Sequence, residues 1–516
     1  MVDEELRWMD ATEQADLVRS GQVSAAELLS EARERVSRLN PALNAVIVEL
    51  DPGSGGLDDA GPGGPGDGGP DDTGPGGPGD GGHHDSAPAA PFAGVPFLVK
   101  DLALEIAGTP FSEGSRWLAG NVSGHDQELA RRFRRAGLAV MGKTNTSEFG
   151  LSPHCEPALH GATRNPWNLA LSTSGSSGAS AAAVAAGIVP MAHGNDLGGS
   201  LRYPAAWCGV FGLKPSRGRV PLGPEYGDVV GGLAAEHALT RTVRDSAALL
   251  DAVAGPAPGD PYWAPPQERP YLAEVRTPPG RLRIAATATP HGGQSAHPDY
   301  LRAFEETVEL LESLGHTVEE GQPEPLGRAG HRAMRAVYGG AAAWIEAYWT
   351  RRLGRGPQPG ELEPYTEVLF ERGRKVTAGE YLQGMEELQR FTRRVAAFFE
   401  DFDLWLTPTV GWPPLPLGTL TATAEDPLRG ERQAGRFLMF NGEHANVTGN
   451  PAMSVPLATD SAGLPVGFSF LAAYGGEATL FRLAGQLEQA RPWAGRRPSV
   501  GGLTRGREAP GADPGA

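Results

Sequence analysis

The chain has 516 residues, of which 62 are Asp or Glu and 45 are Lys or Arg, so its formal net charge is −17. This negative charge opposes nonspecific binding to nucleic acid, and the length allows two or three domains. The two cysteines make no disulfide framework, and the longest apolar stretch, residues 181–192, is too short to cross a bilayer. The first ten residues are acidic and lack the apolar segment of a signal peptide. We therefore expect a cytoplasmic protein without a nucleic-acid or membrane partner.

The first predicted unit is a helical part, residues 1–50. Within it, residues 11–39 predict two amphipathic helices, and Ser24 is the expected N-cap of the second. After Ser24 the apolar side chains recur at helical spacing, at Leu28, Leu29, Ala32, Val36 and Leu39.

Residues 51–90 have a different composition. They contain an imperfect repeat, GPGGPGDGGPDD at 61–72 and GPGGPGDGGHHD at 74–85, with eight aspartates and no lysine or arginine. Such a composition buries too little apolar surface to offset the loss of chain entropy, so we predict a disordered insertion. We interpret His83 and His84 within it as incidental rather than as a metal site.

Strand-like apolar runs alternate with helix-like ones from residue 92 onward. The clearest runs are PFLV at 96–99, the helix-like ELARRFRRAG at 128–137, LAVMGK at 138–143, IVPMAH at 188–193 and LRIAATA at 282–288. This alternation predicts an α/β fold with a mixed central sheet covered by helices on both faces. We expect one large core, residues 91–500, followed by a disordered tail, residues 501–516.

A long helical region is predicted over residues 329–400, with many Arg and Glu side chains. We expect this region to cover part of the sheet and to border the opening through which a substrate enters.

Two serine-bearing, glycine-rich turns stand out between residues 172 and 219. They carry Ser176 and Ser200, which lie 24 residues apart on either side of an apolar segment. A serine hydroxyl becomes a nucleophile when a base takes its proton, and flanking glycines let backbone N–H groups approach a reacting carbonyl. Lys100 follows three apolar residues, and a buried amine held neutral would serve as that base. The pattern is typical of a hydrolase.

Other readings of these residues are less consistent with the sequence. A Gly/Ser-rich run can be a flexible loop or a phosphate cradle, but the run at residues 172–180 has no lysine and so lacks the GK[ST] end of a phosphate-binding loop. No GxSxG elbow surrounds either serine, which argues against an ordinary α/β-hydrolase. We interpret His154 and His193 as packing side chains, and Cys155 and Cys208 as small buried side chains.

These motifs resemble the amidase signature family. The family pattern of a V-K-D lysine, a GGSSGGS run, a GTDTGGSIRxPA turn and a CGxxGLKP tail is matched by Lys100, by residues 174–180, by residues 194–205 and by residues 208–215. The resemblance implies that Ser200 is the acyl-forming nucleophile and Ser176 the bridging serine. It implies that Lys100 is the base, with no cofactor and no metal.

The resemblance also assigns roles to the neighbouring residues. It implies a cis peptide before Ser176, which Gly175 accommodates, and an oxyanion hole made by the backbone N–H groups of Leu197, Gly198 and Gly199. Asp196 and Arg202 are expected to form an ion pair that braces the turn, since a buried charge must be paired.

Several segments resemble the subgroup that includes 6-aminohexanoate-cyclic-dimer hydrolases and related bacterial amidases: NTSEFG at 145–150, TRNPWN at 163–168, HGND at 193–196 and GLKPSRGR at 212–219. The expected substrate is a small linear or cyclic carboxylic amide. The alternatives are an A-type subunit of a tRNA-dependent amidotransferase, from whose usual motif Asn195, Leu197 and Tyr203 depart, and a non-catalytic assembly subunit. Ser174 and Ala179 replace family glycines. The sequence leaves the assembly state open, a homodimer included.

The composition of residues 51–90 predicts that this segment is dispensable for catalysis. A flexible loop lengthens at slight cost, about 0.6 kcal/mol of closure entropy for each doubling. Replacement of the segment by a short Gly/Ser linker should therefore leave kcat/KM on a small amide within a few-fold of the unaltered protein. Before deletion, hydrogen exchange across the segment should show no protection. Slow exchange there, or a large loss of activity in a folded deletion variant, would contradict the prediction.

Overall fold

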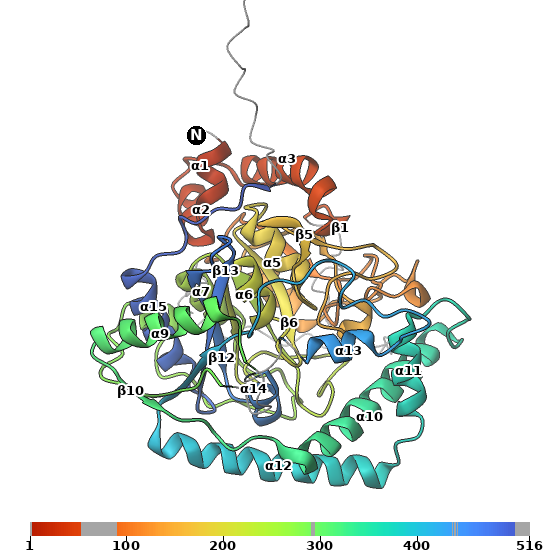
Figure 1. Cartoon of the computed structure of the whole chain (residues 1–516). Helices are drawn as coiled ribbons and strands as arrows, with labels where there is room; N and C mark the ends of the chain where they lie inside the picture. Colours follow the sequence, from red (N-terminus) through yellow and green to blue (C-terminus); the bar gives the residue numbers. More distant parts are fainter. Residues whose placement is uncertain are drawn as a thin grey trace, which may run out of the picture.

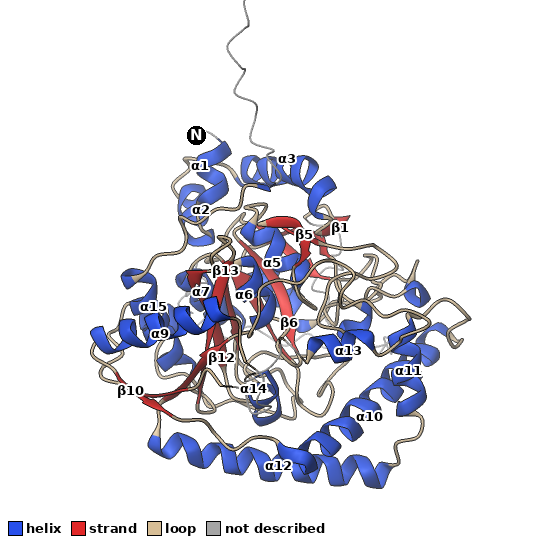
Figure 2. Cartoon of the chain, in the orientation of Figure 1, coloured by secondary structure: helices blue, strands red, loops and turns tan. Residues whose placement is uncertain are grey.

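The computed structural model describes residues 3–52, 90–289, 295–435, 437, 440 and 442–500. The predicted insertion at 51–90 falls almost wholly outside these ranges, as does the predicted tail at 501–516. Figure 1 shows the described chain as helices arranged around a central sheet, and Figure 2 separates the two kinds of element.

The described residues form one large sheet of eleven strands, in the order β1-β3-β2-β6-β8-β7-β12-β13-β11-β9-β10. The strands are β1 (Val46–Glu49), β2 (Pro96–Lys100), β3 (Ala139–Thr144), β6 (Met191–Asp196), β7 (Phe211–Lys214), β8 (Ala235–Thr240), β9 (Arg283–Ala286), β10 (Thr317–Glu320), β11 (Leu404–Pro408), β12 (Ala452–Thr459) and β13 (Pro465–Ala472). A separate ribbon contains β4 (Arg164–Asn165) and β5 (Asn168–Ser172).

The pairing of the strands confirms the predicted mixed sheet. Strands β3, β2 and β6 run parallel, as do β10, β9 and β11, whereas the pairs β6–β8, β8–β7, β7–β12, β12–β13 and β13–β11 are antiparallel. The strand-like runs that the sequence indicated at 96–99, 138–143, 188–193 and 282–288 all contribute to this sheet.

Helices lie on both faces of the sheet, as expected for an α/β fold. They are α1 (Asp3–Trp8), α2 (Ala11–Arg19), α3 (Ala25–Leu43), α4 (Glu128–Arg135), α5 (Gly178–Ala185), α6 (Arg202–Cys208), α7 (Val243–Val253), α8 (Tyr271–Glu274), α9 (Pro298–Ser313), α10 (Gly327–Leu353), α11 (Pro364–Gly373), α12 (Ala378–Asp401), α13 (Arg429–Ala434), α14 (Gly442–Thr448) and α15 (Glu477–Ala490), with short 3-10 turns at Arg116–Leu118 and Glu148–Gly150. Nowhere in the described ranges does a helix combine the length and the apolar character needed to cross a membrane.

The alternation of side chains along β2 decides where Lys100 points. Successive residues of a strand face opposite sides of the sheet. Phe97 and Val99 belong to the apolar cluster that includes α4, α7 and α15, whereas Leu98 belongs to the cluster built around α5 and α3. Lys100 shares the face of Leu98, so its side chain lies on the side of the sheet where α5 begins.

Helix α5 is apolar on every side because it is enclosed. All eight of its residues are buried, and it belongs to one apolar cluster with residues of α3, β2 and β3. A helix without a polar face is stable only in such a position. The turn that precedes α5 is therefore held rigidly over the sheet.

The predicted helical region at 329–400 is three helices, α10, α11 and α12, which form an arc along one end of the molecule in Figure 1. Gly354, with a φ of +70°, ends α10. Phe398 and Phe402 at the end of α12 pack against Trp405 of β11, so the arc covers part of the sheet as predicted.

The N-terminal helices are anchored to the core through a carboxylate. Ser24 caps α3 in a capping box with Glu27, which confirms the predicted N-cap. Helix α2 is capped from a distance, because the Asp245 carboxylate of α7 accepts hydrogen bonds from Ala11 N at 2.7 Å, from Thr12 N at 3.0 Å and from Thr12 Oγ1 at 2.7 Å. An anion at a helix N-terminus satisfies N–H groups that have no partner within the helix.

Replacement of this carboxylate should loosen the N-terminal helices. Asp245→Ala leaves one buried and one partly buried N–H group of α2 without acceptors, so we expect a loss of about 1–3 kcal/mol in the free energy of unfolding. Urea unfolding followed by circular dichroism measures it. Asp16→Ala, which removes an exposed carboxylate of α2, is the matched control and should change the stability by less than about 1 kcal/mol. Equal stabilities of the two variants would refute the anchoring role.

Candidate active site

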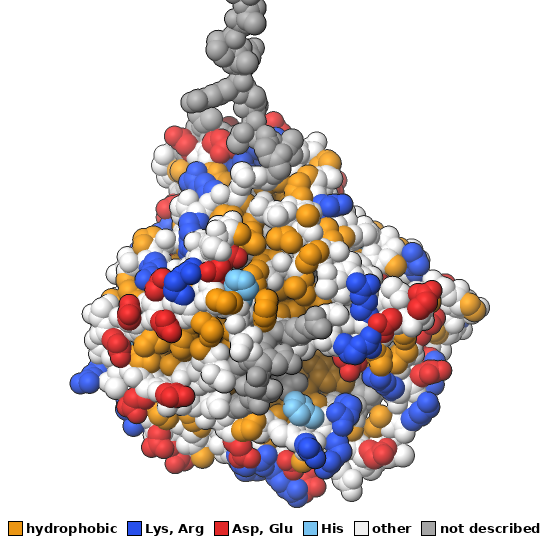
Figure 3. Space-filling view, in the orientation of Figure 1, with side chains coloured by type: hydrophobic (Ala, Val, Ile, Leu, Met, Phe, Trp, Pro, Cys, Tyr) orange, Lys and Arg blue, Asp and Glu red, His pale blue; other side chains and the backbone are white. Residues whose placement is uncertain are grey.

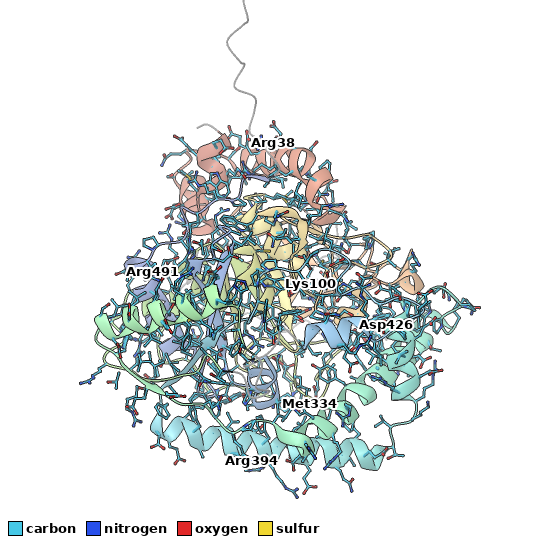
Figure 4. The ribbon with its side chains drawn as sticks, viewed as in Figure 1. Arg38, Lys100, Met334, Arg394, Asp426 and Arg491 are labelled. Atoms are coloured by element: carbon cyan, nitrogen blue, oxygen red, sulfur yellow. The ribbon has the colours of Figure 1, made fainter. Side chains whose placement is uncertain are left out.

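Lys100 lies at the end of β2 in the interior of the molecule, where Figure 4 labels it. Its Nζ donates to Ser176 Oγ at 2.7 Å, to Ser177 Oγ at 3.0 Å and to Asn195 Oδ1 at 2.5 Å. The side chain is fully buried, and this burial lowers the pKa of the amine to about 7. Because desolvation disfavours the ammonium form, a substantial fraction of Lys100 is neutral at pH 7 and able to accept a proton.

Ser176 belongs to the tight turn that leads into α5. The peptide bond between Gly175 and Ser176 is cis. A Cβ on Gly175 would lie 2.1 Å from the carbonyl oxygen of His154, so only glycine fits at this position. The turn packs directly on the chain at 154, which fixes the direction of the Ser176 hydroxyl.

The sequence did not predict two of the hydrogen-bond partners of the Lys100 amine, Ser177 and Asn195. Asn195 lies near the end of β6, and its Nδ2 donates to the carbonyl oxygen of Leu102 at 3.0 Å. This bond turns Oδ1 toward Lys100, so the amide acts as an acceptor. Ser177 Oγ also approaches the backbone oxygen of Asn195, at 3.1 Å. The sequence did mark Asn195, because this residue departs from the usual motif of the A-type amidotransferase subunit.

The turn after β6 is organised around the buried carboxylate of Asp196. It accepts hydrogen bonds from Arg202 Nε and Nη2, both at 3.0 Å, which confirms the predicted ion pair. It also accepts from Gly199 N at 2.7 Å, from Leu201 N at 3.1 Å and from Asn446 Nδ2 at 2.9 Å. Burial would raise the pKa of Asp196, but the Arg202 guanidinium and these bonds hold it well below its usual range.

Ser200 lies on this turn between β6 and α6 and is half-buried. The hydrogen bonds of the described residues join Lys100 to Ser176 but do not join Ser176 to Ser200. Gly199, with a φ of +126°, packs so closely on Tyr203 that a Cβ would lie 2.0 Å from the ring. The N–H of Gly199 donates to the Asp196 carboxylate. This N–H is one of the three that the family resemblance implies for an oxyanion hole.

His193 has a defined role in holding β2 against β6. Its Nδ1 accepts a hydrogen bond from the backbone N–H of Lys100 at 3.2 Å, and its Nε2 lies 2.6 Å from Glu236 Oε2. With Nδ1 acting as acceptor, the proton is on Nε2 and is donated to the carboxylate. His154 is buried and its Nδ1 accepts from Glu156 N at 3.1 Å. Cys155 and Cys208 are free and buried, as expected.

A pocket with about 700 Å³ of empty space opens beside these residues. Ser176, Asn195 and Leu197 line one side. Gly150 lies close to Ser176, since a Cβ on Gly150 would be 3.3 Å from the Ser176 hydroxyl oxygen. An aromatic wall of the pocket is formed by Phe149, Tyr226, Trp344, Tyr348 and Trp349. Three of these five come from α10, so the helical region borders the pocket as predicted. Figure 3 shows a recess with hydrophobic side chains between α13 and α10.

Comparison with known proteins identifies the family of the chain. The sequence profile of the Amidase family matches residues 80–481. The 6-aminohexanoate-cyclic-dimer hydrolase of Paenarthrobacter ureafaciens is 37% identical over 517 aligned residues, covering 98% of this chain and 99% of that protein. The putative amidase AmiC of Mycobacterium tuberculosis strain H37Rv is 36% identical, covering 96% and 97%.

A solved structure of 6-aminohexanoate cyclic dimer hydrolase complexed with substrate superposes with a TM-score of 0.85 and 36% identity, covering 96% of this chain and 99% of that one. The fold and the matched sequence define an α/β hydrolytic enzyme of the amidase class. The chain belongs to the amidase family and is an amidase, a hydrolase of carbon–nitrogen bonds other than peptide bonds.

The acceptor role of Asn195 leads to a prediction about pH. Asn195→Asp places a negative charge beside the Lys100 amine, and a nearby opposite charge should raise the lysine pKa by roughly one to three units from about 7. Because the neutral amine is needed, the rising limb of kcat/KM with pH should move upward by the same amount. Activity should fall at pH 7 and recover toward pH 9.

The control for this experiment is Asn168→Asp, which makes the same charge change at an exposed position on β5. Its pH profile should match that of the unaltered protein. An unchanged rising limb in folded Asn195→Asp would show that Lys100 does not control the profile.

Proposed function

We propose that the chain hydrolyses a carboxylic amide through an acyl-enzyme, with Ser200 as the nucleophile, Ser176 as the bridging serine and Lys100 as the base. The observation that carries the proposal is the buried Lys100 amine, whose pKa is lowered to about 7 and which lies 2.7 Å from Ser176 Oγ. A neutral amine hydrogen-bonded to a hydroxyl is the arrangement that activates a serine.

In the acylation step, Ser200 Oγ attacks the amide carbon and its proton passes to Ser176 Oγ. Ser176 in turn gives its own proton to Lys100 Nζ. The protons return by the same route to the nitrogen of the leaving group as the C–N bond breaks, and the amine departs. Water then attacks the acyl ester under the same base, releasing the acid and restoring Ser200.

Backbone N–H groups of the turn after β6 would stabilise the negative oxygen that develops on the carbonyl. The resemblance to the amidase signature family implies this role for Leu197, Gly198 and Gly199. The Gly199 N–H is already bonded to Asp196 at 2.7 Å, which holds the turn in shape. Leu197 and Gly198 then supply the donors that face the reacting carbonyl in this proposal. Loss of one such donor typically costs about 10²–10³-fold in rate.

The expected substrate is a small linear or cyclic amide. The lining of the pocket is mostly apolar, which suits an aliphatic amide. The most similar relatives reported above are named for hydrolysis of the cyclic dimer of 6-aminohexanoate, so this dimer is the first compound to test. A cytoplasmic location, the lack of a nucleic-acid partner and a homodimer remain predictions.

The alternative functions are an A-type subunit of a tRNA-dependent amidotransferase and a non-catalytic assembly subunit. The first is disfavoured by Asn195, Leu197 and Tyr203, which stand where that subunit's usual motif differs. The second is disfavoured because the lysine and both serines of the relay are retained. Hydrolysis of a simple amide by the purified chain alone separates these functions from the proposed one.

Treatment with a fluorophosphonate should label one serine covalently. We expect a single adduct by intact mass, mapped to Ser200 by peptide mass spectrometry, because only the activated nucleophile reacts. Ser200→Ala should abolish the adduct, and Ser200→Ala, Ser176→Ala and Lys100→Ala should each lower kcat by about 10³-fold or more.

The matched control is Lys375→Ala, at an exposed lysine, which should keep full activity. Circular dichroism of each variant verifies that it is folded. An adduct on Ser176, full activity in Ser200→Ala, or a kcat near that of the unaltered protein in Lys100→Ala would overturn the assignment.

A further inference from the structure

The ionisable side chains of the pocket are all acids. Among the described residues that line it, Glu113, Asp196 and Glu236 carry carboxyl groups, and there is no lysine or arginine. Asp196 is paired with Arg202, and Glu236 accepts from His193. Glu113 forms no ion pair with any residue in the described ranges, so it is the acid of the wall that lacks a cationic partner.

Glu113 is held firmly in place although it is unpaired. It is 6% exposed, and its Oε2 accepts from Trp349 Nε1 at 2.9 Å while Oε1 accepts more weakly from Ala103 N at 3.4 Å. Two nearby carboxylates do have cations: Glu105 binds Arg352, and Asp101 lies 3.3 Å from Lys143 Nζ. The positive charges of this region are therefore already engaged by other acids.

Aromatic rings surround this carboxyl group. Trp349 donates to it, and the ring of Tyr348 lies 5.2 Å from that of Trp349. Tyr226 and Trp344 continue the wall, with centroids 5.7 Å apart, and Trp344 is 38% exposed. Aromatic faces attract a cation through their quadrupole, and they add most where water is excluded.

We propose that Glu113 and the aromatic wall of α10 recognise a primary ammonium group, so that the preferred substrates are linear amides with an alkylammonium group remote from the scissile bond. This inference rests on the proposed function and specifies the substrate class of the same site. Glu113 supplies the negative charge, while Trp344, which is 38% exposed, offers a ring face to the cation. The Tyr348 ring is already contacted by the guanidinium groups of Arg351 and Arg352, at 5.7 and 5.4 Å from its centroid. A carboxylate at the same place would face Glu113 and Glu236 without a cation to pair with.

The state of Glu113 agrees with this role. Burial raises the pKa of its carboxyl group to about 7, and the negative charges of Glu105 and Asp101 act in the same direction, while the bonds from Trp349 and Ala103 oppose the rise. Above pH 7 the pocket therefore holds a buried carboxylate with incomplete compensation. A bound ammonium provides the missing charge, so selectivity for the cation should increase between pH 6 and pH 8.

Three amides of one chain length test the proposal on the full-length protein at pH 8: 6-aminohexanamide, which is cationic; hexanamide, which is neutral; and the monoamide of adipic acid, which is anionic. We expect kcat/KM to fall in that order. Glu113→Gln keeps an acceptor for Trp349 but removes the charge, and should reduce the ratio of kcat/KM for the cationic over the neutral amide by about ten- to hundredfold. Trp344→Leu should reduce this ratio roughly two- to fivefold.

Glu367→Gln, at an exposed position of α11, is the control for loss of one negative charge and should keep the ratio. Equal values for the three amides, a preference for the anionic one, or an unchanged ratio in Glu113→Gln would overturn the proposal.

A binding measurement separates this proposal from the proposed function. If none of the amides is hydrolysed and no fluorophosphonate adduct forms, the proposed function fails. Calorimetric titration with hexylammonium and with hexanoate still tests whether Glu113 and the aromatic wall prefer a cation, because binding needs no turnover. Tighter binding of hexylammonium supports recognition of an ammonium group, whereas equal or tighter binding of hexanoate overturns it.

Discussion

The removal of the Lys100 amine from water is the constraint around which the site is arranged. A lysine pKa lowered from 10.5 to about 7 corresponds to roughly 5 kcal/mol of lost preference for the charged form. The surroundings that impose this are packed apolar elements, chiefly α5 and the strands beneath it. The amine still has three oxygen neighbours. The ammonium donates to all three, whereas the neutral amine has two hydrogens for Ser177 and Asn195 and a lone pair that accepts from the Ser176 hydroxyl. This combination yields a base that is positioned by hydrogen bonds and neutralised by burial.

The same low-dielectric interior makes the Asp196 turn rigid. An unpaired carboxylate there would be costly, and Asp196 is tolerated because Arg202, Asn446 and two backbone N–H groups satisfy it. Asn446 comes from α14, so the turn that carries Ser200 is tied to the far end of the chain. Removing one partner would leave an uncompensated buried charge, so we expect the ion pair to hold the geometry of the turn.

Much of this arrangement follows from local sequence. The pattern of apolar residues predicted β2, β3, β6, β9 and α4, and Ser24 predicted the start of α3. The motifs pointed to Lys100 and Ser176, which the structure brings to 2.7 Å. Sequence reasoning did not find the contacts of Asn195 and Ser177, because they depend on how β6 and α5 are placed relative to β2. It also missed Glu113, which lies outside every motif, 13 residues after Lys100, and whose place in the pocket depends on the contact with Trp349 of α10.

A second buried lysine shows that a lowered pKa does not by itself define a base. Burial, together with the charges of Arg202 and Arg217, also lowers the pKa of Lys214 to about 7. Its Nζ, however, donates to the carbonyl oxygen of Pro215 at 2.8 Å. Lys100 differs because β2 directs it to a serine hydroxyl that borders the pocket. A titration near pH 7 alone could therefore belong to either amine, and it is the contact between Lys100 and Asn195 that distinguishes them.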